Sequence, residues 1–215
     1  MKALRQICFV VPLLLGIFSC AHYPDDTIVL LGPEGYVKTA NELAHKYMLE
    51  DSLANMMFHL NLAPNGDYPP DIEGEYKISE KQFVQSNFHD LDDHHLDMYL
   101  KVERQHNRIA SVYLCEGNTV FTDTAYVTGQ DPWFSLYFEE LKEMDFQGST
   151  HVYHRLVLIT GKKTDEGIEN LYFGNLILDA DEGADPLMGS YLPGWYFVYK
   201  DKDGLSENSD WFDNQ

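Results

Sequence analysis

Residues 96–103, LDMYLKVE, alternate apolar and polar side chains without interruption. In an extended strand, successive side chains point to opposite faces, so this alternation predicts a strand with one buried face and one solvated face. The buried face would carry Leu96, Met98, Leu100 and Val102. A half-buried strand needs a sheet around it, and the flanking sequence predicts one.

Similar segments follow along the chain. Residues 109–115 and 119–128 flank Gly117-Asn118, a pair suited to the tight turn of a β-hairpin. Segments rich in turn residues separate the remaining expected strands, which are 71–78, 133–140, 151–160, 168–178 and 195–200. About eight strands in sequential order predict an antiparallel up-and-down barrel, which has no exposed strand edges; a two-sheet β-sandwich is the alternative.

The region before the expected barrel has helical character. Thr39 and Glu42 have the spacing of a capping box, and apolar residues follow at helical intervals in two sets that are out of phase. Asp51 or Ser52 could cap the second set, which is Leu53, Met56, Met57 and Leu60. The expected organisation is a tether at 20–37, one or two short helices with a linker at 38–70, the barrel at 71–203 and an acidic tail at 204–215.

The first nineteen residues have the features of a secretory signal. Lys2 and Arg5 precede an apolar stretch that is too short to cross a bilayer permanently. The stretch ends in Ile17-Phe18-Ser19-Cys20, which resembles the lipobox of bacterial lipoproteins. This resemblance implies that Cys20 is lipidated and becomes the first residue of the mature chain; an incidental cysteine after an ordinary signal peptide is the alternative.

Charge and cysteine content limit the function classes. The chain carries a net charge of −20, and removing 1–19 makes it −22, so nucleic acid and polyphosphate ligands are disfavoured. Of the three cysteines, only Cys20 and Cys115 would remain. Because Cys20 would be thioether-linked, a disulfide framework is excluded and stability must come from a hydrophobic core.

Several motifs extend the resemblance. Gly74-Glu75-Tyr76 is similar to the Gly-x-Trp that opens the first strand of lipocalin-type barrels, with tyrosine in place of tryptophan. Residues 69–76, 161–173 and 199–205 resemble segments of a group of uncharacterised envelope lipoproteins from Bacteroidetes. The resemblance implies a lipocalin or calycin-like barrel on an outer-membrane lipoprotein, facing either the surface or the periplasm. It implies no catalytic residues.

Two acidic segments are candidate metal sites. Residues 88–97, FHDLDDHHLD, mix imidazoles and carboxylates that suit zinc, manganese or iron, with His89, Asp93, His94 and His95 as candidate ligands. A solvated loop is the simpler interpretation. Asp201 and Asp203 beside Gly204 resemble the start of a calcium loop, although an Asp-Gly turn explains them equally well. The sequence contains no nucleophile elbow, phosphate loop or dinucleotide fingerprint, so no catalytic residue or cofactor is expected.

Aromatic residues crowd the expected strands, and those facing inward could line a ligand cavity or fill a solid core. The candidate lining residues are Tyr76, Trp133, Tyr137, Tyr172, Trp195 and Phe197. Three functions follow. The first is a non-enzymatic barrel that binds a small amphipathic molecule or glycan fragment. The second is a structural or interaction module of an envelope complex, and the third is a metal-dependent hydrolase.

Overall fold

The computed structural model of the protein describes residues 29–31, 37–39, 48–62, 66–88, 92–93, 96–117, 119–146, 149–180 and 192–214. Within these residues the chain is mainly β structure with a single α-helix, α2 (Glu50–His59), and a short 3-10 helix, η2 (Phe212–Asn214). The strands are β1 (Val29–Leu31), β2 (Val37–Thr39), β3 (Asp67–Tyr68), β4 (Gly74–Ile78), β5 (Lys81–Ser86), β6 (Met98–His106), β7 (Ile109–Glu116), β8 (Thr119–Gln130), β9 (Trp133–Phe146), β10 (Ser149–Lys163), β11 (Gly167–Ala180), β12 (Tyr196–Asp201) and β13 (Leu205–Asn208).

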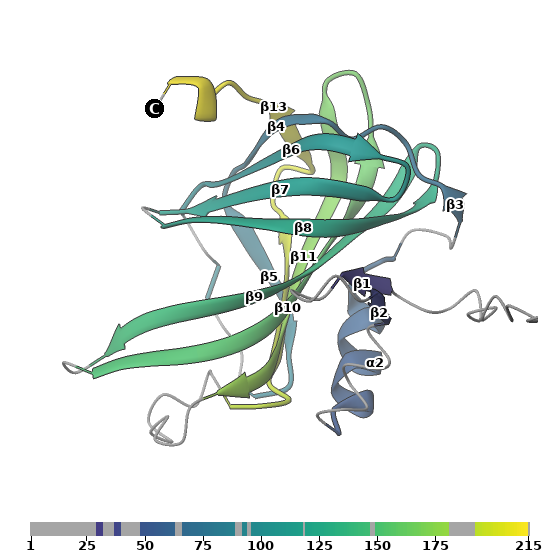
Figure 1. The fold of residues 1–215 in the computed structure, drawn as a ribbon. Helices are drawn as coiled ribbons and strands as arrows, with labels where there is room; N and C mark the ends of the chain where they lie inside the picture. Colours follow the sequence, from purple (N-terminus) through teal and green to yellow (C-terminus); the bar gives the residue numbers. More distant parts are fainter. Residues whose placement is uncertain are drawn as a thin grey trace, which may run out of the picture.

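Eight strands close into a barrel-like ring. The hydrogen-bonded order is β4, β6, β7, β8, β9, β10, β11 and β13, and β13 pairs with β4 again. All these neighbours are antiparallel, which confirms the predicted up-and-down arrangement over the sandwich alternative. Further along β11, β12 takes the place of β13, and β5 pairs with β12, so the sheet continues below the ring (Figure 1).

The alternation of apolar residues explains the filled interior. Met98, Leu100 and Val102 of β6 are buried inside the ring, as the sequence predicts, but the prediction is wrong for Leu96, which precedes the strand and is 57% exposed. The segment before β4 packs into the same cluster through Ile72, whose backbone N–H donates to Gln105 Oε1 at 2.9 Å. Tyr76 is fully buried beside it, and its hydroxyl donates to the Ile72 carbonyl at 2.8 Å. This part of the interior is therefore packed and internally hydrogen-bonded.

Helix α2 covers the outer face of the continuing sheet. Leu53, Met56 and Leu60 are buried against residues of β9 to β12, which confirms the helical spacing of this apolar set. Gly174 of β11 permits the close approach, because a Cβ there would lie 2.9 Å from Leu60 Cδ2. Leu49 occupies the N-cap position and makes no side-chain cap, so the capping role expected for Asp51 or Ser52 is wrong: both lie inside the helix.

Strands β8 and β9 are hydrogen-bonded to each other over only part of their length. Their pairing runs from Gln130–Trp133 back to Tyr126–Tyr137 and then stops. Beyond it, the first half of β8 pairs with β7 and the second half of β9 pairs with β10. Figure 1 shows the long β9–β10 hairpin leaving the ring at an angle to β6, β7 and β8. We call the interior around Tyr76, Leu100 and Phe134 the closed half. We call the end of the ring at which β8 and β9 are no longer paired the open half.

Eight strands match the predicted set, and the differences concern short elements. β5 and β13 carry polar residues at most positions and give no clear periodic signal. β13 lies beyond residue 203, within the stretch expected to be an acidic tail, and β1 lies within the expected tether. The helix expected from Thr39 onward falls largely on residues outside the described part of the chain.

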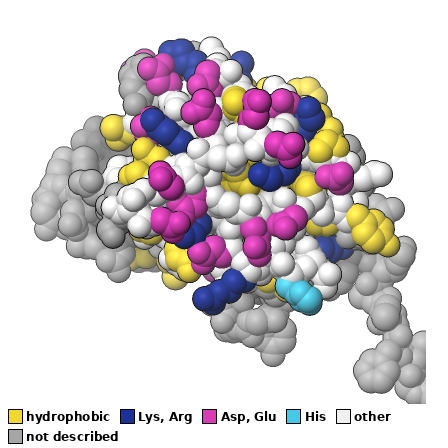
Figure 2. Space-filling model, turned by 90° about the horizontal axis from the view of Figure 1, so that it is seen from above, with side chains coloured by type: hydrophobic (Ala, Val, Ile, Leu, Met, Phe, Trp, Pro, Cys, Tyr) yellow, Lys and Arg dark blue, Asp and Glu magenta, His cyan; other side chains and the backbone are white. Residues whose placement is uncertain are grey.

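The end of the chain docks on the outer surface of the closed half. Trp211 stacks on Tyr99 with ring centroids 4.7 Å apart and an interplanar angle of 15°. Lys101 Nζ lies 2.7 Å from Glu75 Oε1 and 3.2 Å from Asp213 Oδ1, which ties η2 to β4 and β6. Figure 2 shows this end of the molecule, where acidic side chains are spread with Lys and Arg among them.

Candidate functional site in the open half

Strand alternation places an exposed carboxylate on the interior face of the open half. Asp123 pairs with Val112 of β7 and lies on the same face of β8 as Ala125. Val112 and Ala125 both belong to the interior cluster, so Asp123 is on the interior face. Asp123 is nevertheless exposed, so solvent enters the ring where β9 has left β8. Surrounding protein still removes part of its hydration and, with Glu139 nearby, raises the pKa of this carboxyl, while the Thr124 backbone N–H opposes the rise.

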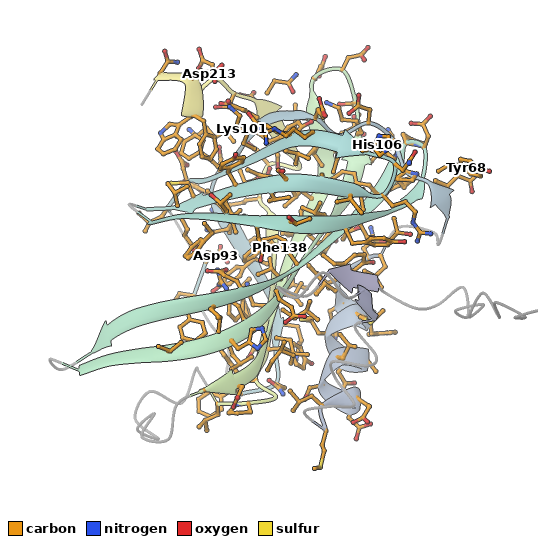
Figure 3. The ribbon with its side chains drawn as sticks, in the orientation of Figure 1. Tyr68, Asp93, Lys101, His106, Phe138 and Asp213 are labelled. Atoms are coloured by element: carbon orange, nitrogen blue, oxygen red, sulfur yellow. The ribbon has the colours of Figure 1, made fainter. Side chains whose placement is uncertain are left out.

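A buried ion pair lies deeper in the open half. Arg155 of β10 places Nε 2.7 Å and Nη2 2.5 Å from Glu140 Oε2 of β9, and both side chains are more than nine-tenths buried. The Arg155 guanidinium also lies over the Phe121 ring of β8, 5.6 Å from its centroid. Arg155 therefore spans the gap between the two diverging strands. Figure 3 shows Phe138, two residues before Glu140, close to the point of divergence.

Asn175 of β11 is a buried polar side chain on the interior face of the ring. It pairs across the sheet with Val157 on one side and Phe197 on the other, and shares a face with Phe173 of the interior cluster. Its exposure is 0%, and neither Oδ1 nor Nδ2 has a hydrogen-bond partner among the residues described. An amide buried without partners costs about 1–3 kcal/mol, so this position calls for an explanation other than packing.

Aromatic rings surround these polar groups. Phe197 is half-buried and packs against Phe173 at 6.5 Å and Trp195 at 5.1 Å between ring centroids. Trp195 Nε1 donates to Ser86 Oγ at 2.9 Å, which fixes the indole against β5. We define the open-end site as Phe121, Asp123, Glu140, Arg155, Asn175 and Phe197. Apolar walls with a few polar groups among them are typical of small-molecule sites.

A second buried polar cluster lies where β5 begins and the neighbouring β12 ends. Lys81, 2% exposed, binds Glu116 Oε1 through Nζ at 2.8 Å. Asp201 pairs with Lys81 across the sheet, and its Oδ2 accepts a hydrogen bond from Ser206 Oγ at 2.6 Å. Burial raises the pKa of Asp201 to about 6, and Asp203 adds to the rise. These contacts hold the β12–β13 junction together and place the Asp201 and Asp203 carboxyl groups beside each other.

The predicted lining residues lie in different parts of the structure. Trp195 and Phe197 lie at the open half, whereas Tyr76 fills the closed half with its hydroxyl already hydrogen-bonded. Tyr137 and Tyr172 belong to the cluster under α2, on the outer face of the sheet, so neither faces the interior. Trp133 is half-buried at the start of β9, in the turn region next to Gln130.

The predicted metal ligands are only partly described. His89, His94 and His95 lie outside the described residues. Asp93 Oδ1 accepts a hydrogen bond from the Phe83 backbone N–H at 3.0 Å, and Asp203 Oδ1 accepts one from the Leu205 N–H at 3.2 Å. Within the described ranges, no three His, Cys, Asp or Glu side chains come together in a way that could hold a metal ion.

Glu140, Arg155 and Asn175 are not among the predicted site residues, although the sequence carries a signal for Arg155 and for Asn175. Arg155 directly precedes the apolar run 156–159, and Asn175 lies in the middle of the largely apolar run 171–178. Both strands are covered on two faces, so a polar residue in either must be buried. A charged or amide side chain inside a doubly buried strand is therefore a usable marker of an interior polar site.

Comparisons with known proteins add no further constraint: a scan of family models, a search of curated proteins and a search of solved structures each found no match. Among the helices in the described ranges, none has the length and apolar character needed to cross a membrane. The residue expected to carry lipid, Cys20, lies outside those ranges. The open-end site consequently has to be interpreted from its own chemistry.

Proposed function

We propose that the protein is a non-enzymatic, lipid-anchored envelope lipoprotein of the Bacteroidetes type, with a lipocalin-like barrel that binds a small amphipathic molecule or glycan fragment. The observation that carries the proposal is the open-end site, in which a buried amide and an ion pair lie among aromatic rings. An ordinary core would place apolar residues there, because each unpaired buried polar group reduces stability. A ligand that pairs with such groups gives them a function.

The anchor is proposed from the sequence alone. Diacylation or triacylation at Cys20 would hold the barrel on the outer membrane, facing either the surface or the periplasm. The direct test is metabolic labelling with palmitate in cells that express the chain or its Cys20→Ala variant. Label in the first and none in the second is the expected result. Equal labelling, or none in either, would contradict the anchor.

Ligand binding is tested first by native mass spectrometry of the purified protein, before and after EDTA. A bound molecule gives a mass above that of the polypeptide, and loss of that excess after EDTA identifies a metal instead. Phe197→Ala removes an aromatic wall of the open-end site, whereas Phe58→Ala on the surface of α2 is the matched control, since Phe58 is 84% exposed. We expect only Phe197→Ala to reduce the ligand peak.

A protein-interaction module is the second candidate. Helix α2 and the residue before Leu49 expose two large apolar side chains, Met48 at 87% and Phe58 at 84%. Exposed apolar side chains on a helix can form the centre of an interface. Crosslinking in cells, compared between the native chain and a Met48→Ser, Phe58→Ser variant, distinguishes the two functions: loss of a stoichiometric partner would favour the interaction module.

A metal-dependent hydrolase ranks third, through His89, Asp93, His94 and His95. Its test is the metal content of a variant in which all four are replaced by alanine. Metal in the native protein and none in the variant would support this function. The Phe83–Asp93 hydrogen bond gives Asp93 a structural role already, so the three histidines carry this candidate.

A further inference from the structure

The chemistry of Asn175 narrows the class of ligand, on the premise that the open-end site binds one. A carboxamide offers one donor group and one acceptor side by side. Both are removed from solvent, and neither has a partner among the described side chains and backbone groups. A ligand head group that satisfies both atoms must itself present an acceptor next to a donor.

The ion pair beside Asn175 argues against a charged head group. Arg155 pairs with Ile177, the position two residues from Asn175 on the same strand, and its guanidinium is bound to Glu140. The guanidinium charge is thus already neutralised. An ionised carboxylate near Asn175 could accept only from Nδ2, would leave Oδ1 unpaired, and would add a negative charge to the interior face that already carries Glu140. A neutral head group avoids all three costs.

We propose that Asn175 recognises a neutral amide group of an amphipathic ligand through a pair of hydrogen bonds, with the apolar part of the ligand lying against Phe197 and Phe121. The proposed ligand class is therefore a primary amide, in which one N–H and the carbonyl oxygen point to the same side, rather than a free fatty acid. In an acylated amine the trans amide directs its N–H and its carbonyl oxygen to opposite sides, so it would pair with only one of the two Asn175 atoms.

Access to Asn175 runs past Phe197. The two residues are cross-strand partners, so the Phe197 side chain is the nearest cover on the β12 side. Unlike Asn175, Phe197 is only half-buried, so part of its ring faces solvent. In this proposal, a rotamer change of Phe197 toward solvent uncovers the amide without moving the backbone. Trp195, which is hydrogen-bonded to Ser86, stays in place.

Isothermal titration calorimetry with two probes of equal chain length tests the proposal. Octanamide and octanoate differ only in the head group, and at about pH 8 octanoate is fully ionised. The proposal predicts that the native protein binds octanamide roughly tenfold or more tightly than octanoate. Equal affinities, or tighter binding of octanoate, would overturn it without the need for any variant.

The variant Asn175→Leu assigns the preference to its residue. Leucine has a similar volume and no polar atom, so it should remove the discrimination between the probes while leaving the fold intact. Thr160→Val is the matched control: Thr160 is also buried on this sheet, but its hydroxyl donates to the Phe134 carbonyl at 3.0 Å and it should not affect the preference. If Asn175→Leu retained the native preference, the assignment to Asn175 would be wrong.

A neutral apolar dye separates this proposal from the function on which it rests. Saturable binding of Nile red, displaced equally by octanamide and octanoate, would preserve a ligand-binding barrel and overturn the amide recognition. Absence of saturable binding of both Nile red and octanamide would overturn the two together. Displacement by octanamide at roughly tenfold lower concentration than octanoate is the supporting result.

Discussion

The two halves of the ring are built from the same strands and differ in what they bury. In the closed half, the interior consists of apolar side chains such as Leu100 and Phe134, and the Tyr76 hydroxyl is hydrogen-bonded to a carbonyl next to it. In the open half, the same strand faces carry Glu140, Arg155 and Asn175. The change from apolar to polar occurs where β8 and β9 lose their pairing.

This difference separates residues that stabilise the fold from residues that are placed for another purpose. The closed half has continuous strand pairing and a filled core, which are sufficient to hold a ring together. The open half has an ion pair whose desolvation offsets much of its attraction, and an amide without described partners. Substitutions in the closed half should therefore change stability and leave binding unaffected, whereas replacement of Asn175 in the open half should reduce binding without loss of stability.

The largest expected effect comes from breaking the buried ion pair. Arg155→Met leaves the Glu140 carboxylate buried without its cation, which should lower the free energy of unfolding by about 3–5 kcal/mol. The double variant Glu140→Leu, Arg155→Met should recover most of that loss, because no charge remains buried. Urea denaturation measures both. A double variant as unstable as the single one would show that the pair itself stabilises the open half.

In the closed half, Leu100→Ala should lower the free energy of unfolding by about 2–4 kcal/mol, since it removes a fully buried side chain from a filled core. It should leave Nile red affinity unchanged once the protein is folded. Chemical denaturation and dye titration of the same sample measure the two quantities. If the folded variant bound Nile red more weakly than the native protein, the closed half would also contain a ligand site. The proposed difference between the two halves would then be wrong.

Asn175→Leu should act in the opposite direction and raise the free energy of unfolding by about 1–2 kcal/mol, because it removes buried polar atoms without described partners. Thr160→Val, which removes a hydrogen-bonded hydroxyl, should lower it instead. Thermal unfolding in the absence of ligand measures both variants. Destabilisation by Asn175→Leu would mean that Asn175 has a structural partner.

The pH dependence of stability offers a further test, through Asp201. Its folded-state pKa of about 6 lies above its ordinary value of 3.8, so the folded protein binds this proton more tightly than the unfolded chain. Its contribution to stability is complete below about pH 4 and is lost as the pH rises through about 6. Relative to Asp201→Asn, the native protein should lose up to about 3 kcal/mol between these limits, since each unit of pKa shift corresponds to about 1.4 kcal/mol. A constant difference between the two unfolding curves would contradict the shift.

The sequence predicts the ring but not which face of each strand is interior. Period-two alternation identifies β6 and β7 because one face of each is solvated. In β9 and β11 both faces are covered, one by the interior and the other by the cluster that contains α2, so the sequence does not distinguish Tyr137 and Tyr172 from inward residues. Their direction depends on non-local packing, in which α2 contacts β11 and β1 contacts β9.

The open-end site could be predicted only in part. The aromatic pattern identifies Phe197, which belongs to this site, and Trp195, which packs against it. Glu140, Arg155 and Asn175 come from three strands, and their proximity depends on the registers of β9, β10 and β11. The loss of β8–β9 pairing that opens the site leaves no local pattern, because both strands continue with different partners.

The central claim is that the open half is a binding site and the closed half is not. A crystal structure of the protein grown with octanamide tests it most directly. The account predicts density for the ligand in the interior of the open half, with its amide within about 3 Å of Asn175 Oδ1 and Nδ2. Density among the closed-half residues, on the outer surface of α2, or nowhere on the protein would contradict it.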